Sequence, residues 1–479
     1  MSYNNTEQKV ENLLVNNENL YDPNNENLNQ NNYKTYIKQV FQKNFGRNIL
    51  ILAIFLFLFI LEFFIRESLF NSSIKFEERW QNNALKSTIA FYKIITKVAG
   101  EYLIVVPVGF VLIYFSFIKS SFYIAGFIFV MHLHSWMKIW YASHRPFWKN
   151  KNLYKEICDA GFGNPSGHSL AATYIYLTLY FYLSEIKLFK DKFVNKIILG
   201  ASLTIYVILI ILSRLILGIH SINQVIYGSA LGIFISLIIV VILQLHKMSI
   251  KTYKSFFKEK KTIIFIISIS LILQLFSILS AAILNGDKKQ YNELSAIIDE
   301  LCGIDYPEYR RFNLDGLFGS FVILSLLGMY LGQVVFWYWI DTTYKKYRLD
   351  SNAKIQFIVN MSEDDNDLNK ENNQEMNDDI LIDCLVNNWN KNTYFKNTNL
   401  IQRLKLIYTI IICCLPLILF VTIKADNMIL LFIFRFAIPF FTTLFLIYSY
   451  GIYNLIVIII EIKDELIKRV NNTNSENRI

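Results

Sequence analysis

Long uninterrupted runs of apolar residues are the feature that most constrains this chain. A helix of about 18 residues or more is long enough to cross a bilayer core of about 30 Å. Ten runs reach this length, at 48–65, 102–118, 121–141, 169–186, 197–217, 222–245, 262–284, 317–340, 404–422 and 429–449. Backbone groups in lipid must bond internally, so each run is expected to be a helix. The alternation that a membrane β-barrel needs is absent.

The overall composition agrees with a membrane protein. Of the 479 residues, 54% are hydrophobic and 16% are aromatic, which is rare in soluble domains of this length. The net charge of +9 does not indicate a nucleic-acid partner, because the lysines cluster beside the apolar runs. We therefore predict an all-α polytopic membrane protein in contact with membrane lipids, with a six-helix core and about four extra transmembrane helices.

Two lysine-rich segments set the predicted orientation. Residues 246–261 carry six lysines directly after a span, and residues 186–196 carry four. Lysine and arginine concentrate on the cytoplasmic side, so both segments and, by alternation, both termini are predicted to be cytoplasmic. Three segments then face the lumen or exterior: 142–168, 214–221 and 285–316. Cys158 and Cys302 both fall in such segments, where an oxidising compartment would permit a disulfide between them.

The same boundaries divide the chain into five parts. They are a disordered cytoplasmic tail (1–47), a six-span core (48–245), a basic cytoplasmic segment with two further spans (246–340), an acidic, Asn-rich cytoplasmic loop (341–403), and two C-terminal spans with a tail (404–479).

Three short polar patches lie at span ends, all on the predicted lumenal face. They read "KIWYASHRP" (138–146), "PSGH" (165–168) and "SRLILGIH" (213–220). Each patch has a plain structural explanation when taken alone. A lysine or arginine can extend to the lipid headgroups, and a serine can cap a helix.

The three patches together indicate a phosphate site. Lys138, Arg145 and Arg214 would be three fixed cations on one membrane face, which suits a phosphate dianion. Ser166 and Gly167 open a helix, whose N–H groups and dipole also attract phosphate. Two histidines, His168 and His220, suit covalent catalysis with one nucleophile and one acid.

In these three motifs the chain resembles the type 2 phosphatidic acid phosphatase superfamily. That family includes vanadium haloperoxidases and glucose-6-phosphatase. Its motifs are Lys, six residues, Arg-Pro; Pro-Ser-Gly-His; and Ser-Arg, five residues, His. All three match in order, spacing and predicted topology over about 48–245.

The resemblance implies a role for each motif residue. Ser166 and the Gly167 amide would hold phosphate oxygens, and Lys138, Arg145 and Arg214 would neutralise transition-state charge. His220 would attack phosphorus to give a phosphohistidine, and His168 would protonate the leaving alcohol. The resemblance implies no metal ion and no cofactor, because cationic side chains take the place of the metal.

One position departs from the family pattern. Many members have an aspartate four residues after the nucleophile, and this chain has Gln224. Glutamine can orient the imidazole of His220 but supplies no negative charge. Glucose-6-phosphatase resembles this chain here, whereas the short loop between Pro146 and Pro165 resembles the sphingoid-base phosphate phosphatases.

The sequence therefore favours a phosphoric monoester hydrolase of the endoplasmic reticulum, another endomembrane or the plasma membrane, with a lumenal or exterior site. A lipid phosphate such as a sphingoid-base phosphate or phosphatidate is the favoured substrate. A glucose-6-phosphatase-like sugar phosphatase, a headgroup phosphotransferase, and a non-enzymatic transporter or scaffold remain alternatives.

Overall fold

A computed structural model describes residues 32–102, 105–153, 159–190, 192–248, 250–284, 288–303, 311–350, 437, 440–448 and 451. These residues form helices and connections, and no strand occurs among them. Six helical segments are long and apolar enough to span a membrane: Phe45–Asn83, Phe117–Lys149, Phe193–Ile216, Ile222–Lys247, Lys260–Ile283 and Leu314–Trp339. The protein is an all-α polytopic membrane protein, which confirms the predicted fold class.

The helices of the predicted tail and core follow one another with short connections. They are α3 (Asn32–Lys43), α4 (Phe45–Asn83), α5 (Lys86–Tyr102), α6 (Val105–Tyr114), α7 (Phe117–Tyr141), α8 (Pro146–Lys149), α9 (Gly167–Ser184), α10 (Lys187–Lys190), α11 (Phe193–Ile216) and α12 (Ile222–Leu237). A π-helical turn (Ile238–Ile242) and a 3₁₀ turn (Leu245–Lys247) follow α12.

Helix α9 lies inside this bundle, in contact with α7, α11 and α12. It coincides with the predicted span at 169–186 but is not among the six most apolar segments. Its buried face includes polar side chains such as Thr173 and Thr178. Because neighbouring helices rather than lipid cover this face, α9 tolerates polar side chains that bond to protein groups: Thr178 to Ser236, and Thr173 to a backbone carbonyl.

Two glycines of α12 allow it to approach α9 closely. A Cβ atom on Gly228 would lie 2.6 Å from the Ser166 carbonyl oxygen, and one on Gly232 would lie 2.6 Å from that of Leu170. Small residues four apart let two membrane helices pack backbone to backbone. This packing sets the first turn of α12 beside the first turn of α9.

The predicted span at 102–118 is wrong as a single helix. The structure places the ten-residue helix α6 there, and α7 begins at Phe117 after an extended Ser116. The predicted span at 404–422, and all but a few residues of that at 429–449, lie outside the described residues.

The predicted tail is also partly wrong. Residues 32–43 form helix α3, which packs against α13 (Ile250–Lys258). The Tyr36 hydroxyl donates to the Gln244 carbonyl at 2.9 Å, and Lys34 pairs with Glu259 at 3.1 Å. Contacts with a segment two hundred residues away thus order this helix, although its local sequence is polar.

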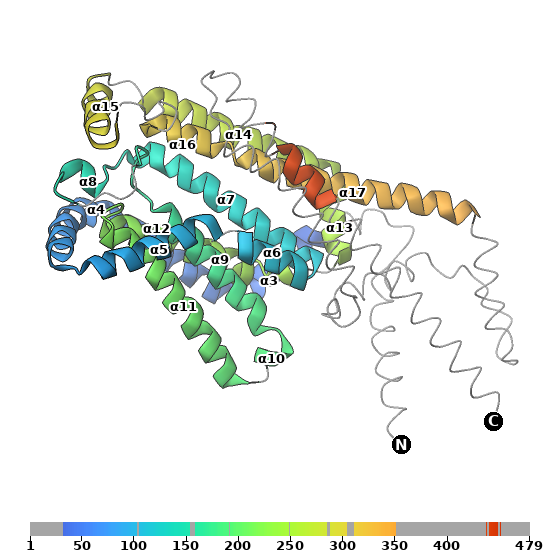
Figure 1. The fold of residues 1–479 in the computed structure, drawn as a ribbon. Coiled ribbons are helices and arrows are strands. Elements are labelled where there is room, and N and C mark those ends of the chain that lie inside the picture. Colours follow the sequence, from blue (N-terminus) through green and yellow to red (C-terminus); the bar gives the residue numbers. More distant parts are fainter. Residues whose placement is uncertain are drawn as a thin grey trace, which may run out of the picture.

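The further spans lie along the core rather than apart from it. Helices α14 (Lys260–Leu284), α16 (Phe312–Ser320) and α17 (Ile323–Asp350) all contact α7, and α14 and α16 run beside it in Figure 1. Helix α15 (Lys288–Cys302) lies near α8 at one end of the bundle. Phe147 and Trp148 share a buried cluster there with Ile298 and Phe312.

Candidate active site

The three predicted cations lie at helix termini. Lys138 lies in the last turn of α7, Arg214 in the last turn of α11, and Arg145 immediately before α8. Helix α7 ends at Tyr141, and the left-handed backbone of its C-cap residue Ala142 (φ 41°) turns the chain toward α8. All three side chains are buried, and Arg145 is 0% exposed.

Two helix starts supply the remaining predicted residues. Ser166 is the N-cap residue of α9, and Gly167 and His168 are the first residues of that helix. His220 lies in the short connection between α11 and α12, and Gln224 lies in the first turn of α12. The Ser166 N–H donates to the Gln224 carbonyl at 3.0 Å, so the two helix starts are joined directly.

The Arg145 guanidinium is held by several acceptors. Nε donates to the Gly161 carbonyl at 2.6 Å, and Nη1 donates to the Ile219 carbonyl at 3.2 Å. Nη2 donates to the Asp159 carboxylate at 2.5 Å. Nη1 also lies 3.3 Å from Nε2 of His220. The arginine is therefore fixed beside the predicted nucleophile.

Asp159, which was not among the predicted site residues, carries a negative charge in this cluster. Burial raises the pKa of Asp159, but the Arg145 guanidinium, the Lys138 ammonium and the Gly161 N–H outweigh burial and bring that pKa down to about 2. The carboxylate is therefore ionised at neutral pH and compensates the buried cations.

A second unpredicted carboxylate comes from outside the predicted six-span core. Asp315, in the first turn of α16, lies 3.2 Å from the Lys138 ammonium through its Oδ2 atom. An acidic side chain is favourable at a helix N-terminus, where the dipole is positive. The packing of α16 on α7 therefore gives a predicted phosphate ligand a partner from the extra spans.

Arg214 differs from the other two cations. Its Nε atom is buried and has no hydrogen-bond partner among the described residues, and no ion pair of Arg214 occurs among them. Its backbone carbonyl accepts from the N–H groups of Ile219 and His220 at 3.1 and 3.2 Å. These bonds shape the turn that carries His220 and leave the guanidinium available for an anion.

The bonds to His220 determine which ring nitrogen carries the proton. Its Nδ1 atom faces two oxygens, the Gly163 carbonyl at 2.9 Å and Oε1 of Gln224 at 3.1 Å. Gln224 is oriented in turn, because its Nε2 donates to the His144 carbonyl at 2.8 Å and its Oε1 accepts from the Ser221 N–H at 3.3 Å. Two acceptors require a proton on Nδ1, which leaves a lone pair on Nε2.

The surroundings also favour neutral His220. Burial lowers the pKa of the His220 imidazole well below its usual value, and the charges of Arg145, Arg214 and Lys138 lower it further. The hydrogen bond with Gln224 acts in the opposite direction but does not outweigh them. A neutral imidazole with a lone pair on Nε2 is the form that can act as a nucleophile.

Ser166 occupies the N-cap position but does not cap α9 with its side chain. Its hydroxyl accepts from Ser169 Oγ at 3.0 Å, and no side-chain cap bond is formed. A Cβ atom on Gly167 would lie 2.7 Å from Nε2 of His134, so a larger residue would collide with that ring. The neighbourhood of Gly167 therefore requires glycine.

The partly exposed His168 ring lies within electrostatic range of Arg214, Arg145, Lys138 and Asp159. The structure thus brings both predicted histidines and all three predicted cations into one cluster.

Of the other four histidines, His246 pairs with Glu185 at 3.1 Å, and the remaining three differ in their surroundings. His132 interacts with the Ser320 carbonyl at 2.8 Å, which joins α7 to the end of α16. The His144 ring packs against Trp148. In His134, both ring nitrogens are shielded from solvent and have no hydrogen-bond partner among the described residues. His134 is therefore a further candidate for the site.

Signals for the missed residues were present in the sequence. Glu62 and Asp315 are carboxylates within or at the start of apolar runs, where a charge usually has a function. Asp159 lies in the short loop between two motifs. No pattern in the sequence indicates that these three side chains lie near the motif residues.

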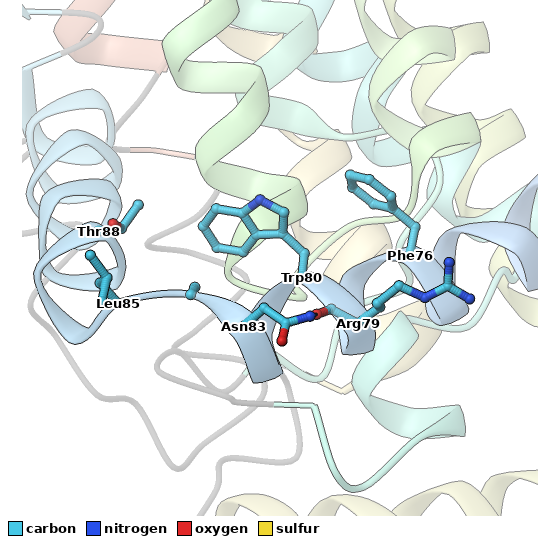
Figure 2. A pocket seen from close by; sticks show the side chains of 7 residues that line it. Phe76, Arg79, Trp80, Asn83, Leu85 and Thr88 are labelled. Carbon is cyan, nitrogen blue, oxygen red and sulfur yellow. The ribbon is translucent and has the colours of Figure 1, made fainter.

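The described residues form hollows near this end of the bundle. One, of about 440 Å³, is formed where α4 turns into α5, with Phe76, Arg79 and Trp80 on one side and Leu85 and Thr88 on the other (Figure 2). It contains none of the motif residues. Another, of about 120 Å³, lies between α4 and α12 and is lined mainly by apolar side chains, with Glu62 and Asn223 among them.

Comparisons with known proteins agree with the motifs. The model of the PAP2 superfamily matches residues 119–248, which hold every predicted site residue. No curated protein gives a significant match. One similar solved structure is the first transmembrane PAP2 type phosphatidylglycerolphosphate phosphatase from Bacillus subtilis, with 20% identity over 40% of this chain and 93% of that chain, and a TM-score of 0.35.

The family match confirms the predicted relationship: residues 119–248 are a domain of the PAP2 superfamily.

Proposed function

We propose that this protein is a membrane-embedded phosphatase that hydrolyses a phosphate monoester through a phosphohistidine on His220. The observation that carries this proposal is the state of His220. Its Nδ1 is bound to two oxygens, and its Nε2 lies 3.3 Å from Arg145 within a cluster of three cations. A neutral imidazole held in this way can attack phosphorus, and the cations stabilise the charge on the phosphoryl oxygens.

A bound phosphate group would take the place of two carboxylates as the partner of the buried cations. Lys138 and Arg145 are paired with Asp315 and Asp159, and both carboxylates are about one-third exposed. Arg214 contributes a guanidinium with no ion pair among the described residues. A dianion with three equatorial oxygens can accept bonds from these cations, from the Ser166 hydroxyl and from the Gly167 N–H.

The chemistry needs two steps. The charge of Arg214 and burial lower the pKa of the His168 imidazole, and the negative charge of a bound phosphate would raise it. Nε2 of His220 forms a bond to phosphorus while the bond from phosphorus to the alcohol oxygen breaks, and His168, protonated in this complex, gives that oxygen its proton. Water then attacks the phosphohistidine, and neutral His168 accepts a proton from this water. The bond from nitrogen to phosphorus breaks and inorganic phosphate leaves. Each histidine returns to its starting state.

A disulfide supports the proposed side of the membrane. Cys302 is disulfide-bonded and belongs to the buried cluster of α15 beside Trp148, near Arg145. Disulfides persist in oxidising compartments. This bond supports a lumenal or exterior site, with the lysine-rich segments on the opposite side. Cys158, the predicted partner, lies outside the described residues.

A lipid phosphate is the substrate class that the surroundings favour. The pocket between α4 and α12 lies within membrane spans and is lined mostly by apolar side chains. A hydrocarbon chain fits such walls better than the hydroxyl groups of a sugar do.

The experiment is a phosphate-release assay on purified protein with EDTA present. The substrates are a sphingoid-base phosphate, phosphatidate, glucose 6-phosphate and an aryl phosphate. We expect lipid phosphates to be hydrolysed despite EDTA, with inhibition by vanadate, which adopts the five-coordinate transition-state geometry. Activity that EDTA removes and magnesium restores would contradict the proposal. Turnover of glucose 6-phosphate alone would keep the chemistry but replace the substrate class.

A further inference from the structure

Buried polar atoms without partners lie at or beside the pocket between α4 and α12. They are Oε2 of Glu62, Nδ2 of Asn223 and Oδ1 of Asn164, all shielded from solvent and without a hydrogen-bond partner among the described residues. Glu62 and Asn223 line the pocket directly, and their residues are only 8% and 2% exposed. Buried polar groups in folded proteins are nearly always bonded, so a group of unbonded ones points to a missing ligand.

The environment of the Glu62 carboxylate suits a cation. Its Oε1 atom accepts from Nδ2 of Asn164 at 3.2 Å, and Glu62 forms no ion pair with any described residue. The Tyr141 hydroxyl also hydrogen-bonds to this carboxylate, and the charge of Arg66 attracts it. The Arg66 guanidinium lies over the Tyr141 ring, 5.0 Å from its centre. A buried carboxylate without a paired cation favours a ligand that carries positive charge.

This group of atoms lies next to the predicted phosphate site. Asn164 precedes Ser166 by two residues, and Asn223 precedes Gln224, which binds the His220 ring. Oδ1 of Asn223 also accepts from the Ser221 hydroxyl at 2.7 Å, so its Nδ2 is the group left to donate. Glu62 and Asn223 are thus joined to the segments that carry Ser166 and His220.

The walls of the pocket continue toward the lipid. Leu58 and Phe59 of α4 and Ile226 of α12 line it, and they are 43%, 38% and 57% exposed. These apolar side chains lie in segments that are long and apolar enough to span a membrane. One end of the pocket is polar and adjoins the catalytic cluster, and its sides are apolar.

We propose that Glu62 and Asn223 form a headgroup subsite for a lipid phosphate that carries an ammonium group beside its phosphate-bearing carbon. Glu62 accepts from the ammonium, Nδ2 of Asn223 donates to a hydroxyl oxygen of the same headgroup, and the hydrocarbon chain follows α4 and α12 into the bilayer. This inference rests on the proposed phosphatase function and assigns its substrate class.

The test compares three substrates on one preparation of the full chain. They are a sphingoid-base phosphate, which has the ammonium group, a lysophosphatidate, which has a hydroxyl there, and an aryl phosphate, which has neither group nor chain. The variant is Glu62→Gln, which keeps the shape and removes the charge. The matched control is Glu67→Gln, an exposed glutamate on the same helix.

We expect Glu62→Gln to lower kcat/KM for the sphingoid-base phosphate about 10- to 100-fold, mainly through KM, because a charge-assisted bond is lost. Turnover of the other two substrates should change less than about threefold. Glu67→Gln should behave as the wild type. An equal loss on all three substrates would show a structural role for Glu62 and overturn the inference, as would no loss on any.

A second pair of variants keeps the inference testable if Glu62→Gln does not fold. Ala230→Phe fills the pocket, and Ala201→Phe places the same ring on the exposed surface of α11. Ala230→Phe should reduce turnover of both lipids by about tenfold or more and spare the aryl phosphate. Unchanged lipid turnover would overturn the inference. Wild-type protein that hydrolyses none of the three substrates would instead reject the proposed function, and the inference with it.

Discussion

The cationic cluster and the pocket between α4 and α12 meet at the first turn of α12. They differ in whether their buried polar atoms have bonding partners. In the cluster, Arg145 and Lys138 each have a carboxylate partner, and Nδ1 of His220 has two acceptors. In the pocket, atoms of Glu62 and Asn223 have no partner among the described residues. Among the described residues of the cluster, Arg214 also has an unbonded buried atom, as does the neighbouring His134.

The difference indicates that the two regions interact with a substrate in different ways. Groups that stabilise a transition state work best when neighbouring bonds already hold them in place, since no reorganisation is then needed during reaction. Groups that recognise a substrate gain selectivity when only the correct ligand can satisfy them. The cluster fits the first description and the pocket fits the second. The following predictions, in order of decreasing effect, test this division.

His220→Ala should remove all chemistry. The nucleophile is lost, so turnover of every substrate, with or without a hydrocarbon chain, should fall to background. No phosphoenzyme should form when labelled substrate is quenched and the protein is isolated. Trapped phosphoenzyme in this variant would mean that another residue is the nucleophile.

His168→Ala should slow the enzyme without removing the nucleophile. Positioned proton transfer contributes about 10²- to 10⁴-fold, so a lipid alcohol should leave that much more slowly. An aryl phosphate, whose leaving oxygen needs no proton, should lose much less. Phosphohistidine should still be trapped in the first turnover. A phosphoenzyme in His220→Ala and none in His168→Ala would reverse the two assigned roles.

Asp159→Asn should destabilise the protein and tighten phosphate binding. Arg145 would remain buried without its counter-charge, at a cost of about 2–3 kcal/mol, below that of a fully buried pair because Asp159 is partly exposed. The depressed pKa of Asp159, about 2, means that this stabilisation is present near neutral pH and is lost as pH falls toward 2. Thermal unfolding with and without inorganic phosphate measures it. Unchanged unfolding would show that the pair contributes little.

Gln224→Glu should shift the acid limb of the pH profile upward. The added carboxylate beside Nδ1 favours the charged imidazole and should raise its pKa. Neutral His220 is the attacking form, so kcat/KM should begin to fall at a higher pH on acidification. Gln224→Asn, without a charge, is the control. A shift in both variants would point to geometry rather than charge.

Asp315→Asn should have the smallest effect. Its pair with Lys138 is about one-third exposed on the Asp315 side, and such pairs contribute about 0.2–1 kcal/mol. Without this competitor, Lys138 should bind phosphate up to about fivefold more tightly. Inhibition by inorganic phosphate provides the measurement. A large loss of activity would mean that Asp315 positions Lys138 for catalysis.

Much of the fold could be predicted because lipid imposes a local rule on each span. Helices α4, α11 and α14 are apolar over about twenty residues, and each was recognisable from its own sequence. The span at 102–118 was not, because the helix break at Ser116 lies inside a continuous apolar run. Helix α3 was missed because its order comes from α13 and Gln244, far away in the sequence.

In the candidate site, too, some features could be predicted from the sequence and others depend on tertiary contacts. The types and spacing of Lys138, Arg145, Ser166, His168, Arg214 and His220 were sufficient to indicate phosphate chemistry, since each motif lies within one short segment. Gln224 was visible as a departure, but its oriented amide depends on the His144 carbonyl.

Only the tertiary structure could place Asp315 on Lys138, Asp159 on Arg145, and Glu62 beside Asn164. Sequence patterns record local periodicity and spacing, and these specify where helices begin and end and which residues crowd a helix terminus. They do not record which faces of distant helices meet. The carboxylate on Lys138 comes from 177 positions along the chain and Glu62 lies 102 positions from Asn164, so packing between helices decided these partners.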